Sequence, residues 1–178
     1  MDAYLNETAK MFQDCLRESS GVELKIVRES ASGSEKPGIY LGNTAFARKN
    51  GIDISRMPKW GWINTVRGNN LIIAGNDYIQ TSRIVSGTTK GVTSFLEREL
   101  GVRFVMPGKN GISVPARKVV SVSSGLDVSG SSQINFTNIN YSHDYYGIAN
   151  GLGLGMAGIK THGGHSYYDA VPAKTCGG

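Results

Sequence analysis

Apolar residues near the start of the chain recur at the spacing of a helix. Leu5, Ala9, Phe12 and Leu16 are separated by steps of four, three and four residues, which places them on one face of an α-helix. Ser19-Ser20-Gly21 then ends the pattern, because serine and glycine there favour a helix terminus. The pattern therefore predicts that an amphipathic helix opens the chain.

The next segment changes from a helical period to a strand period. Val22 to Arg28 alternates apolar and charged side chains as far as Ile26-Val27, which is typical of a half-buried strand. The run from Gly38 to Gly42 is short and apolar, and Asn43-Thr44 is suited to cap a brief helix over residues 45–48. We therefore expect a strand, a second strand and a short helix in this order.

The middle of the chain predicts a hairpin followed by a helix. Residues 60–66 and 71–75 are rich in β-favouring side chains, and the turn residues 67–70 join them. A helix is expected from Thr88 or Thr89 to Leu100, with Gly101 just past its end as the C-cap. Short strands are expected at 102–106 and 119–122.

These elements predict an α+β fold, with a mostly antiparallel sheet and helices packed on one face. We assign residues 1–122 to this domain. Residues 123–133 are rich in serine and glycine and nearly uncharged, so they are expected to form a linker. Residues 134–178 contain one strand-like alternation, at 134–141, and then a glycine-rich stretch without apolar periodicity, so we expect them to form an incomplete tail.

Composition narrows the class of protein. The chain has 178 residues, of which 39% are hydrophobic and 19% charged, a balance that excludes a disordered or membrane protein. The net charge of +5 permits anionic partners. However, no Lys/Arg-rich run or RNA-binding aromatic motif occurs, so we expect no nucleic-acid partner. No apolar segment is long enough to suggest a membrane partner, and the compartment is left open.

Two stretches of the tail contain residue types used in cofactor or metal sites, but their contexts argue against both. Residues 153–158 match the letters of a dinucleotide-binding loop, yet neither a buried strand before them nor a helix after them is predicted. His143, His162, His165 and Cys176 are zinc-type ligands, but their spacing sets no tetrahedral geometry. We therefore predict neither a cofactor nor a metal site.

Polar and aromatic residues in the tail form a candidate sugar groove. Asp144 and Asp169 each lie near tyrosines, and a carboxylate pair is what glycoside cleavage requires. The sequence cannot establish that the two carboxylates are paired, so we assign no catalytic residue. The alternatives left open are a loop surface, a small enzyme and a carbohydrate-binding groove. The groove would use His143, Asp144, Tyr145, His165, Tyr167 and Tyr168.

Residues 87–104 have the sequence GTTKGVTSFLERELGVRF. This sequence is more distinctive than the apolar spacing of a helix and a strand would require. Together with Pro107-Gly108 and Val114-Pro115 they resemble the domain that precedes the barrel in alpha-glucuronidase-like and beta-hexosaminidase-like glycoside hydrolases, often described as hexosaminidase domain 2. The predicted order of elements agrees with that domain over residues 3–122. The resemblance implies an accessory domain that is not catalytic and packs against a (β/α)₈ barrel carrying the sugar site.

The same resemblance gives an interpretation of the tail. Residues 134–178 look like the start of that barrel, but a barrel of about 250 residues does not fit in them, so the chain alone is expected to be inactive. The expected partners are a carbohydrate or the missing barrel domain. The first strand of such domains is also missing, and the unprotected sheet edge this leaves would allow a homodimer. The alternative is an autonomous carbohydrate-binding module that uses the tail groove.

Overall fold

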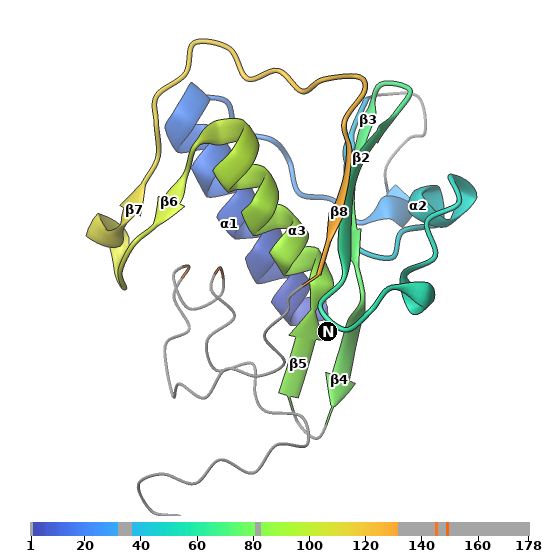
Figure 1. The fold of residues 1–178 in the computed structure, drawn as a ribbon. Helices are drawn as coiled ribbons and strands as arrows, with labels where there is room; N and C mark the ends of the chain where they lie inside the picture. Colours follow the sequence, from blue (N-terminus) through green and yellow to red (C-terminus); the bar gives the residue numbers. More distant parts are fainter. Residues whose placement is uncertain (1, 32–36, 81–82, 132–144, 146–148, 150–178) are drawn as a thin grey trace, which may run out of the picture.

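The computed structural model describes residues 2–31, 37–80, 83–131, 145 and 149 (Figure 1). Its helices are α1 (Asp2–Ser20), α2 (Ala45–Lys49) and α3 (Gly87–Phe95), the last continued by the π-helical turn η3 (Leu96–Leu100). Three short 3₁₀ turns are η1 (Glu29–Ala31), η2 (Ile54–Arg56) and η4 (Lys109–Gly111). The strands are β1 (Ile39–Leu41), β2 (Trp62–Arg67), β3 (Asn70–Gly75), β4 (Asp77–Gln80), β5 (Arg83–Ser86), β6 (Arg103–Phe104), β7 (Ile112–Ser113) and β8 (Asp127–Gly130).

Four strands form the central sheet in the order β1-β3-β2-β8. β2 and β3 are an antiparallel hairpin in which Trp62 pairs with Gly75 and Arg67 with Asn70. β8 adds to β2 in the antiparallel sense, whereas β1 runs parallel to β3. Two small antiparallel ribbons, β4–β5 and β6–β7, lie outside this sheet. The fold is therefore α+β with a mostly antiparallel sheet, as predicted.

The two long helices lie side by side on one face of the sheet (Figure 1). Their apolar stripes bury Met11 on α1 and Val92 and Leu96 on α3 and η3, all with 0% exposure, against Leu71 and Ile73 of β3. Phe12 and Phe95 join the helices, with ring centroids 5.6 Å apart. This interface between the helices and the sheet is the main hydrophobic core.

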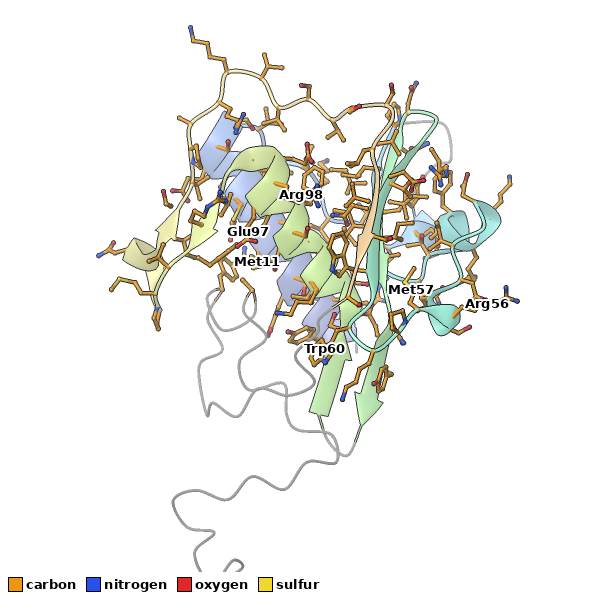
Figure 2. The ribbon with its side chains drawn as sticks, viewed as in Figure 1. Met11, Arg56, Met57, Trp60, Glu97 and Arg98 are labelled. Carbon is orange, nitrogen blue, oxygen red and sulfur yellow. The ribbon has the colours of Figure 1, made fainter. Side chains whose placement is uncertain are left out.

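The opposite face of β3 carries a second, smaller core. Because side chains alternate along a strand, Ile72 and Ala74 point away from the long helices and pack against Ala47 of α2 and the nearby Ile52. Figure 2 shows Arg56 and Met57 on this side of the sheet and Glu97 on the other. The two long helices share one face, as predicted, but the short helix α2 packs on the other, because Ile72 and Ala74 of β3 leave an apolar surface there.

Most of the predicted helices and the central hairpin are confirmed. α1 spans the predicted amphipathic stretch, and the Thr44 side chain caps α2 by accepting a hydrogen bond from the Ala47 N–H at 3.1 Å. α3 and η3 cover the predicted helix and end at Gly101, whose positive φ of 79° suits a glycine C-cap. These elements depend mainly on local spacing and capping.

Several predicted strands and the linker differ from the structure. Residues 22–28 and 119–122 form no strand, because a strand needs a neighbour and the described chain gives them none. The expected linker contains β8, which the open edge of β2 recruits although its own sequence, Asp-Val-Ser-Gly, has little strand preference. The β4–β5 ribbon was not predicted either.

Candidate functional site

A buried polar cluster lies where α3 begins. The Ser86 side chain accepts a hydrogen bond from the Thr89 N–H at 3.2 Å and so caps the helix. The Asp77 carboxylate, from β4, accepts hydrogen bonds from the Thr88 N–H at 2.9 Å and the Ser86 hydroxyl at 3.0 Å, and also from the Thr88 hydroxyl. Asp77 therefore provides a second cap for α3.

Hydroxyl groups extend this cluster from α3 to α1. Thr89 Oγ1 lies 2.8 Å from Ser86 Oγ and 2.8 Å from Thr8 Oγ1. Burial raises the pKa of Asp77, while the hydrogen bonds from Thr88 and Ser86 act in the opposite direction. Because these groups bond to one another, the cluster is best explained as a structural network that joins the two long helices.

A shallow pocket of about 310 Å³ lies along α3 and η3 beside β2. The described side chains that line it are polar except for one aromatic ring and one alanine. The described residues that line it are Trp62, Lys90, Thr93, Ser94, Glu97, Ser131 and Ala149.

The positively charged side chain in this pocket, Lys90, is hydrogen-bonded to the backbone of the same chain. Lys90 Nζ donates to the Ala149 carbonyl oxygen at 3.2 Å, and Thr93 Oγ1 lies 3.5 Å from the same oxygen. Burial lowers the pKa of Lys90, and the nearby Glu97 carboxylate opposes that shift. Part of the pocket therefore holds residue 149 in place, and Ala149 itself is only 3% exposed.

The lining residues also limit the chemistry of this pocket. Glycoside hydrolysis uses two carboxyl groups on opposite sides of the scissile bond. Among the described residues that line the pocket, Glu97 is the single carboxylate. Those residues do not form an acid–base pair, whereas hydroxyls beside a tryptophan ring are compatible with weak contact to a polar ligand.

The groove predicted in the tail falls almost entirely outside the described residues. His143, Asp144, His165, Tyr167 and Tyr168 lie there. Tyr145 is described, and its hydroxyl donates to Asp14 Oδ2 of α1 at 2.7 Å while its ring packs against the main core. Burial and then the Asp14 carboxylate raise the pKa of Tyr145. Tyr145 thus attaches to α1, and no partner from the predicted groove is described beside it.

Sequence reasoning missed Asp77 and Lys90, for different reasons. Asp77 reaches the start of α3 through the β4–β5 ribbon, so no local pattern connects it with Thr88, 11 residues later. Lys90, Thr93 and Glu97 do share one helical face, at spacings of three and four. That spacing was a usable signal that these residues face one location.

Three further observations concern metal ligands, the cysteine of α1 and membrane-spanning helices. In residues 2–31, 37–80 and 83–131, with 145 and 149, no three His, Cys, Asp or Glu side chains are grouped to hold a metal ion. Cys15 is buried in the main core, and burial raises its pKa to about 12. None of the helices in the described part of the chain has the length and apolar character needed to cross a membrane.

Comparison with known proteins finds no family model, curated protein or solved structure that matches this chain. The resemblance of residues 87–104 to glycoside hydrolase accessory domains therefore stays a prediction.

Proposed function

We propose that this chain provides a non-catalytic accessory domain of a carbohydrate-active protein of the glycoside hydrolase type, and that it is inactive alone. The carbohydrate class comes from the resemblance of residues 87–104. The accessory role is supported by how that same stretch is used in the fold.

The observation that carries the proposal is that the distinctive residues of this stretch face the interior. Val92, Leu96 and Leu100 are 0% exposed and pack against α1 and the sheet. A side-chain carbon on Gly87 would lie 2.1 Å from the Gly61 carbonyl oxygen, so only glycine allows this approach of α3 to the chain before β2. A motif that builds the interface between helix and sheet fits a scaffold better than a catalyst.

The test is a combined binding and hydrolysis assay on the folded chain. Oligosaccharides bearing uronic acid or N-acetylhexosamine are titrated while tryptophan fluorescence is followed. Trp62 faces the pocket and reports a ligand there, whereas the buried Trp60, 5% exposed, reports that the chain is folded. We expect no saturable change in fluorescence and no released sugar, while an active glycoside hydrolase cleaves the same panel as the positive control.

Three outcomes would contradict the proposal. Release of sugar by the purified chain would show catalysis. A saturable fluorescence change that is lost in Trp62→Phe but kept in Trp60→Phe would place a ligand in the pocket of α3 and η3. A saturable change kept in both variants would favour the alternative, a binding module that uses the tail.

A further inference from the structure

Residues 21–28, here called the strap, connect α1 to η1 and are exposed along their whole length. The strap includes four large apolar side chains, with exposed fractions of 55% for Val22, 41% for Leu24, 48% for Ile26 and 58% for Val27. It forms neither helix nor strand within the described structure, although its residues alternate as in a strand. A segment with strand-forming residues and no strand partner is suited to pair with another chain.

The strap is held at both ends. At its start the Gly21 N–H donates to the Arg17 carbonyl at 2.8 Å, closing the last turn of α1. Just after its end the Glu29 carboxylate accepts hydrogen bonds from the backbone N–H groups of Ala45 and Phe46, at 2.6 and 2.7 Å. Because both ends are anchored, less conformational entropy is lost when the strap pairs with a partner.

We propose that the strap is a self-association surface through which two copies of this chain pair as antiparallel strands about a two-fold axis at Leu24. In this register Val22 lies opposite Ile26 of the second copy, and Leu24 opposite Leu24. Glu23 lies opposite Lys25, and the symmetry repeats this pair. One face of the ribbon is then apolar and the other carries two pairs of opposite charges, both of which favour strand pairing.

Neighbouring registers lack this complementarity. Centring the axis on Glu23 places two glutamates opposite each other, and centring it on Lys25 places two lysines opposite each other, both of which are unfavourable. A one-residue slip places charged side chains opposite apolar ones. The sequence of the strap therefore matches a second copy of itself in one register.

The contacts of Leu24 agree with this register. Its carbonyl oxygen accepts a hydrogen bond from the Gln13 side chain of α1. In an extended strand the backbone groups of successive residues point to opposite edges. When the Leu24 groups face α1, those of Glu23 and Lys25 face outward, which is the arrangement needed for hydrogen bonds across the two-fold axis.

The test uses charge reversal in the full chain, followed by sedimentation equilibrium. The interface is small, so association is measured up to roughly 1 mM chain, where weak interfaces still form. We expect the wild type to approach twice the chain mass of 19.1 kDa. Glu23→Lys and Lys25→Glu should each weaken dimerisation about tenfold, because each places like charges opposite one another twice per dimer. Within its own chain Glu23 Oε2 lies 3.6 Å from Arg17 Nη1, so Glu23→Lys also removes this exposed ion pair.

The decisive step is to mix these two variants. In the mixed dimer the two lysines of one chain face the two glutamates of the other, so the mixture should associate about as well as the wild type. The double variant Glu23→Lys/Lys25→Glu should also dimerise. The control is Lys49→Glu, which makes the same change from lysine to glutamate as Lys25→Glu but at an exposed position on α2. It should leave association unchanged.

Several results would overturn the proposal. One is a wild type that remains monomeric up to roughly 1 mM, the concentration at which weak interfaces are measured. Another is a dimer insensitive to both single reversals, which would show that a different surface, such as the outer edge of β1, joins the copies. A third is failure of the mixed variants to associate while each keeps the wild-type circular dichroism spectrum.

Discussion

The helix α3 and the strap differ in how far they are packed against the rest of the chain. Seven of the nine residues of α3 are buried, between α1 and the central sheet. In the strap, every residue is exposed. Both segments carry a regular pattern of apolar residues, at helical spacing in α3 and in alternation with charged residues in the strap, so the difference does not come from a lack of pattern in the strap.

The difference follows from how each type of element satisfies its backbone. A helix forms its hydrogen bonds within itself and needs neighbours only for its apolar face. A strand needs a second strand for its hydrogen bonds. α3 is therefore expected to determine the stability of the monomer, whereas substitutions in the strap are expected to affect association. Three predictions test this division, in order of decreasing effect.

The largest effect is expected for Gly87→Ala at the start of α3. The added carbon would lie 2.1 Å from the Gly61 carbonyl oxygen and 2.5 Å from the Asn76 nitrogen, both backbone atoms. We expect a loss of more than about 3 kcal/mol in the free energy of unfolding, or no folded protein, because backbone on both sides prevents relaxation. Urea denaturation followed by circular dichroism measures this.

Gly125→Ala is the matched control for that substitution. The nearest atom to its added carbon is Ser123 Oγ at 3.8 Å, an ordinary contact distance, so the expected change is within about 0.5 kcal/mol. Equal stability of the Gly87 and Gly125 variants would show that α3 does not need its close approach to the chain before β2.

The second prediction compares the same substitution in the two regions. Leu96, at the junction of α3 and η3, is 0% exposed, whereas Leu24 in the strap is 41% exposed. Leu96→Ala should lower the free energy of unfolding by about 3 kcal/mol, because it leaves a cavity in the core. Leu24→Ala should change it by no more than about 0.5 kcal/mol. Urea denaturation at low micromolar concentration keeps the chain monomeric; similar losses in both variants would refute the division.

The third prediction concerns the cap of α3 by Asp77. Asp77→Ala should cost about 2 kcal/mol, because the Thr88 N–H and two hydroxyls lose their acceptor in a buried place. Asp77→Asn should cost less, because the amide oxygen still accepts a hydrogen bond and no charge is buried. Urea denaturation of the three proteins at pH 7 tests this order.

The pH dependence of the stability of the wild type and of Asp77→Asn tests how burial affects the Asp77 carboxylate. Because burial raises the pKa of Asp77, the folded state binds its proton more tightly than the unfolded state. The contribution of Asp77 is therefore greatest at low pH and is lost as the pH rises from about 4, the ordinary value for Asp, through the raised pKa. The stability of the wild type relative to Asp77→Asn should fall over this range, and a rise would contradict the assigned cause.

The candidate site was less predictable than the fold. Lys90 and Glu97 share a helical face that the sequence displays, but their pocket also needs Trp62 from β2 and Ala149, which is 59 residues from Lys90. Asp77 reaches α3 because the β4–β5 ribbon turns the chain back. Such long-range placements depend on how elements pack, which local spacing does not specify.

The sequence alone determined the elements whose hydrogen bonds and caps are local: α1, α2 with its Thr44 cap, α3 with Gly101, and the β2–β3 hairpin with its short turn. Only the tertiary structure decided which strand-like segments became strands. Residues 127–130 have weak strand preference but lie beside the open edge of β2, so they pair as β8. The strap has the stronger strand pattern but no neighbouring strand in the described fold, and it remains exposed. The physical reason is that a strand is completed by another part of a chain, whereas a helix completes itself.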